Sequence, residues 1–191
     1  MAIVPKTYLP NYGEFYEKRW FSARKYDAVM VNLMDPEDDG DELEYNAGSK
    51  KAGDRAVGSE VLFGNNVMIE MGSGDQRVKL GIEICEDAWT PVSPGRLLAM
   101  VGAEVILNLS ASNEVIGKAA YRHKLIGSVS SDCLCGYVYV SAGMYESTSD
   151  LVFSGHNLMY ENGKLLGEVK PFEDGVLIRD ITVSYTHLRA H

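Results

Sequence analysis

Short runs in which apolar and polar residues alternate predict the strands of this chain. In the clearest run, Val78, Leu80, Ile82 and Ile84 are spaced two apart, and the run leads into Cys85. Similar patterns predict further strands over the ranges 27–33, 56–63, 66–71, 103–109, 136–142, 158–160, 165–169 and 175–183.

Turns and helices separate these strands. Turn-forming residues at 64–66 and 161–163 predict two hairpins between the strands that flank them. Pro94 opens and Gly102 closes a short helix, because proline suits the first helical position and glycine the residue after the last. A second helix is predicted over 117–134 by helical spacing. Its apolar stripe contains Tyr121, Leu125, Val129 and Cys133.

The order strand–helix–strand–helix–strand in the middle, with antiparallel pieces at both ends, predicts a layered α/β fold with a mixed sheet. Residues 1–183 form one domain in this interpretation, with an acidic insertion at about 35–55. The insertion holds eight acidic and three basic residues, so 3 − 8 = −5 of the chain's net charge of −9 lies there. It is too poor in apolar side chains to offset the entropy of ordering, and we expect it to be mobile.

Composition and charge exclude several classes of protein. A chain of 191 residues, 46% of them hydrophobic, can bury one substantial core. Its net negative charge disfavours binding to nucleic acid. Neither a transmembrane run nor a signal-peptide pattern occurs, so we expect no membrane partner. Three cysteines without CxxC spacing argue against a disulfide framework and a metal site, and favour a reduced, cytoplasmic setting.

Cys85 is the first candidate for chemistry. It follows a strand, and the carboxyl end of a strand is where α/β proteins place reactive groups. The backbone amide after such a nucleophile can point at a developing oxyanion. The competing interpretation is a cysteine that only packs in the core. We adopt that interpretation for Cys133 and Cys135.

Residues 4–21 mix two prolines, six aromatic residues and five charged residues without any periodicity. The composition alone fits either the lining of a site or an ordinary loop. From Lys6 the run reads Lys-x-Tyr-Leu-Pro-Asn-Tyr-x-Glu-Phe-Tyr-Glu-x-Arg-x-Phe, and from Gly81 a second motif reads Gly-x-Glu-Ile-Cys-Glu-Asp-x-Trp. Together they resemble the glutaminase domain of NAD synthetases, within the nitrilase (carbon–nitrogen hydrolase) superfamily. The resemblance spans most of 4–181 and implies a four-layer α/β/β/α sandwich, incomplete at the amino terminus.

The resemblance also assigns roles. It implies a Glu-Lys-Cys triad in which Cys85 is the nucleophile and Lys6 stabilises the oxyanion. Glu14 matches a second glutamate that holds the lysine and the substrate. The backbone amide of Glu86 would be the second oxyanion donor, and its carboxylate would pair with the α-ammonium group of glutamine. The positions that match glutamine contacts are Tyr12, Phe15, Glu86 and Ser112.

Parts of the family pattern have no match in this chain. The general-base glutamate of the triad precedes the lysine in the family, so we expect the chain alone to be nearly inactive. No cofactor is implied here, because ATP and Mg²⁺ would bind a synthetase domain that uses the ammonia to convert deamido-NAD to NAD. Residues 184–191 match nothing in the family, and we expect a non-native tail. Expected partners are glutamine, the synthetase domain and further copies in a homo-oligomer.

Two alternatives stay open at this point. One is a stand-alone amidase or nitrilase that acts on another amide, against which the set of glutamine contacts argues. The other is a non-catalytic fragment that serves as an interaction domain. Without the first strand of the fold, an exposed sheet edge and apolar face would favour aggregation.

Overall fold

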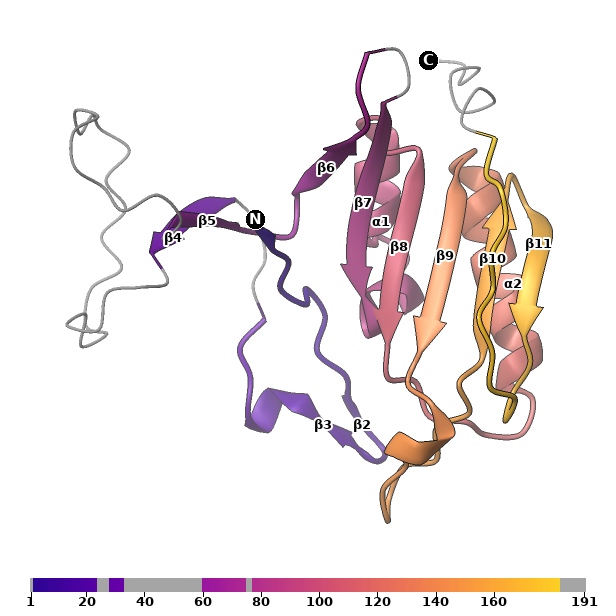
Figure 1. The fold of residues 1–191 in the computed structure, drawn as a ribbon. Helices are drawn as coiled ribbons and strands as arrows, with labels where there is room; N and C mark the ends of the chain where they lie inside the picture. Colours follow the sequence, from indigo (N-terminus) through magenta and orange to yellow (C-terminus); the bar gives the residue numbers. More distant parts are fainter. Residues whose placement is uncertain (1, 24–27, 33–59, 75–76, 183–191) are drawn as a thin grey trace.

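The computed structural model describes most of the chain, namely residues 2–23, 28–32, 60–74 and 77–182. The expected mobile insertion at 35–55 and the tail at 184–191 lie outside these residues. Figure 1 shows one large sheet with two helices behind it and a smaller sheet beside it. None of the described helices has the length and apolar character needed to cross a membrane.

Six strands form the large sheet in the order β11-β10-β9-β8-β7-β6. They are β6 (Met68–Met71), β7 (Val78–Ile84), β8 (Val105–Ser110), β9 (Gly136–Ser141), β10 (Asn157–Glu161) and β11 (Lys164–Val169). The three central strands, β7, β8 and β9, run parallel, and the outer strands pair antiparallel. The mixed sheet is therefore confirmed, and so is the hairpin between β10 and β11.

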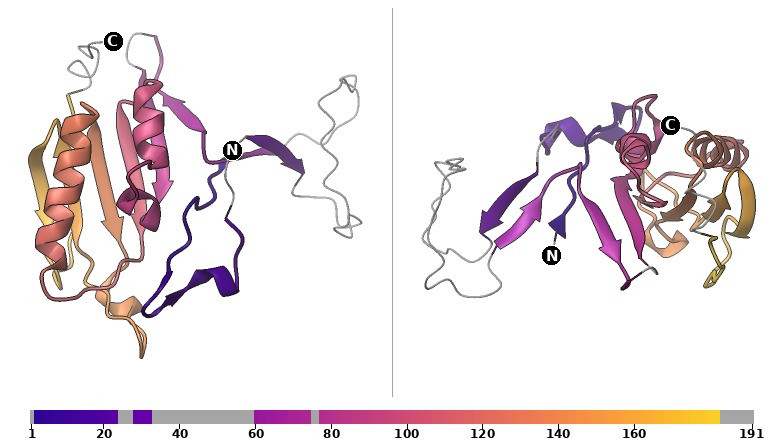
Figure 2. Two further views of the ribbon diagram at one scale, coloured as in Figure 1. Left: turned by 180° about the vertical axis from the view of Figure 1, so that it is seen from behind. Right: turned by 90° about the horizontal axis from the view of Figure 1, so that it is seen from above.

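Both α-helices cover the same face of this sheet (Figure 2). Helix α1 (Pro94–Met100) begins after Ser93, whose hydroxyl accepts a hydrogen bond from the Arg96 amide at 3.1 Å. Helix α2 (Lys118–Asp132) is also confirmed, and Val129, Leu125 and Cys133 of its predicted apolar stripe pack in or against the core. The prediction is wrong for the fourth member. Tyr121 is exposed and stacks on a ring outside the core. Arg122, predicted to lie away from the stripe, is buried because its guanidinium finds polar partners in Glu114 and His156. The buried residues of α2 are Arg122, Ile126, Val129 and Ser130.

The core lies between the helices and the large sheet. Its fully buried members include Ile106, Tyr137, Leu158 and Cys135. Cys133 packs partly buried against the same cluster, and no disulfide joins the three cysteines. The packing role predicted for Cys133 and Cys135 is therefore confirmed.

The predicted last strand at 175–183 is wrong for its described part, because residues 175–182 form no strand. This segment lies extended in front of β10 in Figure 1. Its side chains fill the space that two sheet glycines leave. A Cβ on Gly167 would lie only 2.6 Å from the Leu177 side chain, and a Cβ on Gly136 would lie 3.0 Å from the Ile181 side chain. The segment therefore packs on the face of the large sheet and does not pair with a strand at the edge of the sheet.

A smaller sheet contains β1 (Ala2–Ile3), β5 (Glu60–Phe63) and β4 (Val29–Asn32), in that order. The hairpin predicted between 56–63 and 66–71 is wrong, because β5 belongs to this sheet and β6 to the large one. Between them the Gly64 amide donates to Ile3 O at 3.1 Å. A Cβ on Gly64 would lie 2.7 Å from the Cα of Ala28. That close approach turns the chain from one sheet to the other.

Candidate active site

Cys85 stands where β7 ends and the 3₁₀ turn η2 (Cys85–Trp89) begins. Its φ is +51°, in the left-handed region that residues other than glycine seldom adopt. Such conformations cost on the order of 1–3 kcal/mol and cluster at active sites. The half-buried thiol lines a cavity of about 760 Å3.

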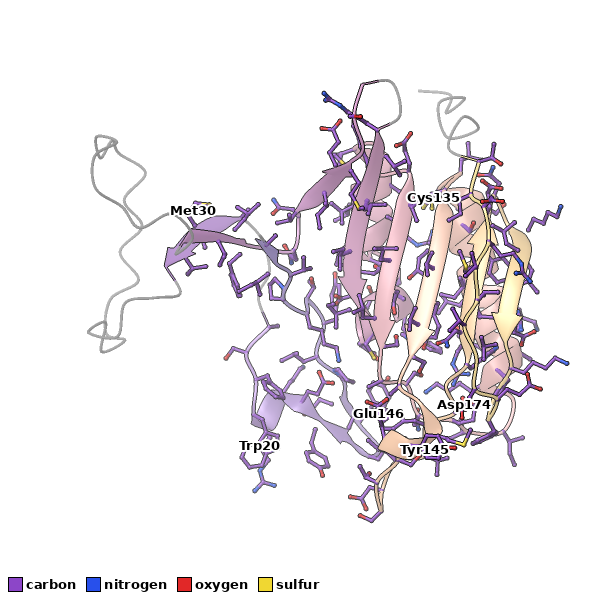
Figure 3. All side chains as sticks on the ribbon, in the orientation of Figure 1. Trp20, Met30, Cys135, Tyr145, Glu146 and Asp174 are labelled. Carbon is purple, nitrogen blue, oxygen red and sulfur yellow. The ribbon has the colours of Figure 1, made fainter. Side chains whose placement is uncertain are left out.

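Segments from distant parts of the sequence form this cavity. Its polar lining includes Lys6, Glu17 and Ser22 of the amino-terminal segment, Ser110 at the end of β8, and Ser141 at the end of β9. Glu146 in the η3 turn (Met144–Glu146), labelled in Figure 3, completes it. The carboxyl ends of the three parallel strands thus meet the amino-terminal segment here. This is the sheet edge at which α/β folds bind ligands.

Asp87 joins the Lys6 segment to the turn that carries Cys85. Its buried carboxylate accepts hydrogen bonds from the amides of Thr7 at 3.0 Å, Tyr8 at 2.8 Å and Ile84 at 3.1 Å. Burial raises the pKa of Asp87, and these backbone hydrogen bonds act in the opposite direction. One side chain therefore holds in place both the segment that follows Lys6 and the end of the strand that precedes Cys85.

Lys6 forms an ion pair with Glu17 and not with Glu14. Its Nζ lies 2.6 Å and 2.7 Å from the two carboxylate oxygens of Glu17. Glu14 instead accepts a hydrogen bond from the Asn113 side-chain amide. Gly13, with φ +55°, turns the hairpin of β2 and β3 just before Glu14 and directs it toward Asn113. In this structure Glu17, and not Glu14, contacts Lys6, and the role that the resemblance gave to Glu14 stays a prediction.

None of the four predicted glutamine contacts lines the cavity, and the structure brings two of them, Tyr12 and Glu86, together at η2. Strands β2 (Asn11–Tyr12) and β3 (Phe15–Tyr16) carry two of them, whose rings meet edge to face at 5.9 Å. The Tyr12 hydroxyl donates to Glu86 Oε2 at 2.9 Å. Burial and the neighbouring Glu86 carboxylate raise the pKa of Tyr12. Burial also raises the pKa of Glu86, against the effect of the Tyr12 hydrogen bond and Lys6. Ser112 is buried in the loop between β8 and α2.

Lys118, the first residue of α2, was not predicted as a site residue. Its ammonium donates to the Asn113 side-chain carbonyl and lies 5.2 Å from the centre of the Trp89 ring. Trp89 in turn stacks on Tyr121 at 5.5 Å. Burial and the nearby Arg122 lower the pKa of Lys118, while a charge on Cys85 acts to raise it. The sequence contained no signal for this residue beyond its place at a helix start. Glu17 and Asp87, by contrast, stand inside the quoted motifs.

Among the described residues, one group could bring three metal ligands together: His123, His156 and Glu168, with ligand atoms within 4.8 Å of one another. Arg122 lies 2.8 Å from Nδ1 of His156 and can only donate, so this nitrogen accepts. The proton of neutral His156 is then on Nε2, which lies 3.0 Å from Glu168. His156 has no lone pair left for a metal, and the group is a partly buried hydrogen-bond network instead.

Comparison with known proteins adds the family. A family model described as carbon-nitrogen hydrolase matches residues 6–190. The chain belongs to the carbon-nitrogen hydrolase family. The glutamine-dependent NAD(+) synthetase of Mycobacterium tuberculosis is 38% identical over 176 residues, which cover 92% of this chain and 22% of that protein. The Aquifex aeolicus protein of the same name is 34% identical over 178 residues, which cover 93% of this chain and 24% of that protein. This carbon-nitrogen hydrolase chain therefore spans under a quarter of the length of those relatives.

Solved structures agree with the fold. The glutamine-dependent NAD⁺ synthetase of Acinetobacter baumannii superposes with a TM-score of 0.60 at 20% identity, over 89% of this chain and 24% of that chain. The glutamine-dependent NAD(+) synthetase from Cytophaga hutchinsonii superposes with a TM-score of 0.55 at 26% identity, over 85% of this chain and 22% of that chain. The nitrilase-type α/β fold and the resemblance to the glutaminase domain of NAD synthetases are confirmed.

Proposed function

We propose that this chain is the glutamine-hydrolysing part of a glutamine-dependent NAD synthetase. The observation that carries the proposal is the joint lining of one cavity by Cys85 and Lys6, held together by Asp87. The name of the relatives supplies the substrate, glutamine, and the fate of the ammonia.

The proposed reaction begins with attack of the Cys85 thiolate on the side-chain amide carbon of glutamine. A carbon–sulfur bond forms, and the amide oxygen becomes an oxyanion that Lys6 and the Glu86 amide stabilise. The carbon–nitrogen bond then breaks, and the nitrogen takes up a proton and leaves as ammonia. Water hydrolyses the remaining thioester to glutamate and restores the thiol.

Proton transfer is the step that the described residues support least. The carboxylate closest to Lys6 belongs to Glu17, and it is already held in an ion pair with the lysine. We therefore propose that the chain alone turns over slowly, because general-base catalysis commonly contributes about 10²–10⁴-fold.

The remaining proposals concern the parent protein. ATP and Mg²⁺ would bind its synthetase domain, where ammonia converts deamido-NAD to NAD. We also propose that the parent protein is a homo-oligomer. Three cysteines without a disulfide fit a cytoplasmic location.

The test is covalent labelling of the 191-residue chain with a chloroketone analogue of glutamine. We expect Cys85 to be modified much faster than Cys133 and Cys135, as read by peptide mass spectrometry, and glutamine to protect it. The variant Lys6→Met should slow labelling of Cys85 by about 10²–10³-fold. The matched control is Lys124→Met, on the exposed side of α2, which should leave the labelling rate unchanged. Labelling spread equally over the three cysteines would overturn the proposal.

Substrate preference separates this function from a stand-alone amidase. A chloroketone derived from a simple aliphatic amide has no α-amino acid group. If it labels Cys85 as efficiently as the glutamine analogue, the chain is a general amidase and not a glutaminase.

A further inference from the structure

His156 is a buried histidine that directly precedes β10 and does not line the cavity of Cys85. Helix α2 packs over this part of the sheet (Figure 2). The Nδ1 atom of His156 accepts a hydrogen bond from Arg122 at 2.8 Å, and its Nε2 donates to Glu168 at 3.0 Å. Protonation would turn Nδ1 into a second donor against a guanidinium that cannot accept. The contact with Arg122 therefore requires a neutral His156.

Arg122 connects this histidine to the loop at residues 111–117, which leads from β8 to α2. Its fully buried side chain donates to the Asn113 backbone carbonyl at 3.2 Å and pairs with Glu114 at 2.8 Å. One guanidinium thus holds two neighbouring residues of the loop and His156 at the same time.

The same loop forms part of the candidate active site. Its first residue, Ala111, lines the cavity together with Cys85. The Asn113 side chain donates to Glu14 in the amino-terminal segment and accepts from Lys118. A shift of the loop would therefore change both the wall of the cavity and the contact of the loop with the amino-terminal segment.

The surroundings of His156 oppose its protonation. The titratable and charged groups that face it are Arg122 and His123 from α2 and Glu168 from β11, while Glu114 of the loop and Tyr160 of β10 contact Arg122 and His123 in turn. Glu168 contacts the Nε2 atoms of both histidines, so it does not separate Nδ1 of His156 from the guanidinium. Burial lowers the pKa of His156, the hydrogen bond to Glu168 opposes this effect, and Arg122 adds to it. The ring is therefore neutral at pH 7.5, and mild acid places a second cation beside Arg122.

We propose that neutral His156 is a positioning residue, which through Arg122 holds the 111–117 loop in the geometry that binds substrate, and that its protonation releases the loop and weakens the site. This inference rests on the proposed glutaminase function and adds its regulation by pH. Because His156 acts from behind the sheet through the loop, the acid-sensitive step is separate from ionisation of the Cys85 thiol.

The experiment measures two labelling rates of Cys85 in the 191-residue chain, one with the chloroketone analogue of glutamine and one with iodoacetamide. Both reagents respond equally to ionisation of the thiol, so the ratio of the two rates reports on substrate recognition. In the wild type we expect this ratio to fall about 10-fold between pH 7.5 and pH 5, because a displacement of about 1 Å can cost up to roughly 10²-fold. His156→Gln keeps an acceptor for Arg122 and a donor for Glu168 without titrating, and it should hold the ratio constant within about twofold.

Two further variants separate positioning from stability. His156→Leu removes the acceptor and should show a ratio about 10-fold below that of His156→Gln already at pH 7.5. His123→Gln replaces the neighbouring histidine, which also contacts Glu168 but has Tyr160 at its other nitrogen, and it should follow the wild-type pH profile. Melting curves define the pH range in which each protein is folded, and only rates from that range are compared.

Each outcome has a definite meaning. A parallel fall of the ratio in the wild type and in His156→Gln, or equal ratios in His156→Gln and His156→Leu at pH 7.5, overturns the role of His156. If His156→Leu does not fold, the pH profiles of the wild type and His156→Gln decide. Wild-type Cys85 that ignores the chloroketone at pH 7.5 but reacts with iodoacetamide overturns the proposed function as well. Selective labelling of Cys85 at pH 7.5 with a ratio that stays constant over the folded pH range overturns only the inference.

Discussion

The carboxylate of Asp87 accepts a hydrogen bond from the backbone amide of Tyr8 at 2.8 Å across 79 positions of sequence. The same carboxylate accepts from Thr7 and from Ile84, the residue before Cys85. A single buried side chain thus links the segment that carries Lys6 to the turn that carries Cys85. Preorganised geometry of this kind is what oxyanion stabilisation requires.

Replacing Asp87 by alanine tests this arrangement. We expect a loss of roughly 2–4 kcal/mol in the free energy of unfolding, because buried amides are left without an acceptor. Hydrogen exchange at Thr7 and Tyr8 should accelerate selectively. Urea denaturation and amide exchange measure the two effects.

Asp132→Ala is the control for that prediction. Asp132 is also an acid with a hydrogen-bond partner, Arg96 at 3.3 Å, but 59% of its side chain is exposed. Surface pairs contribute at most about 1 kcal/mol. Similar losses in the two variants would contradict the special role of Asp87.

The partner of Lys6 can be identified by comparing two conservative variants. Glu17→Gln removes the charge that holds Lys6 and should slow chloroketone labelling of Cys85 by about 10–100-fold through lost preorganisation. Glu14→Gln keeps an acceptor for Asn113 and should change the rate by less than about threefold. A larger effect from Glu14→Gln would restore the role that the resemblance gave to it.

Two arginines on the same face of the sheet differ in burial and should differ in effect. Arg122 is fully buried, and its guanidinium pairs with Glu114 at 2.8 Å and bonds His156. Arg122→Met should destabilise the chain by about 3–5 kcal/mol, because it leaves a largely buried carboxylate without its partner. Arg96→Met breaks a surface pair and should stay within about 1 kcal/mol. Chemical denaturation of both variants checks the difference.

His156 should make the chain sensitive to mild acid. Burial lowers its pKa below the ordinary 6.5, and Arg122 adds to this effect, while the hydrogen bond to Glu168 opposes it. The unfolded chain therefore binds this proton at higher pH than the folded chain. The contribution of His156 is present above pH 6.5 and is lost as the pH falls through the lower, folded pKa.

Melting curves between pH 7.5 and pH 5 on the wild-type chain and on His156→Gln measure this effect. The wild type should lose stability more steeply than the variant as the pH falls below 6.5. Glu168, whose pKa its two histidine partners hold below the ordinary 4.5 against the effect of burial, should contribute only at lower pH. Parallel curves for the two proteins would contradict the assignment.

Much of the fold was predictable from local patterns. Alternation located β7, the mainly apolar runs at 103–109 and 136–142 located β8 and β9, and Pro94 with Gly102 marked α1. The errors fell on relations between elements. The residues at 64–66 have the composition of a hairpin turn, but Gly64 instead passes close to Ala28 and leads into another sheet. Residues 175–182 alternate like a strand, but they pack on glycine positions of the sheet face.

The sequence by itself determined which residues are candidates for the chemistry, because Cys85 and Lys6 stand in motifs that can be read from the order of residues alone. Only the tertiary structure decided which acid holds the lysine, since Glu14 and Glu17 are nearly equivalent along the chain and a single turn at Gly13 separates their directions. It also introduced Asp87 and Lys118 to the site. Their partners are distant in sequence, and contacts between distant segments are set by packing of the sheet and not by spacing along the chain.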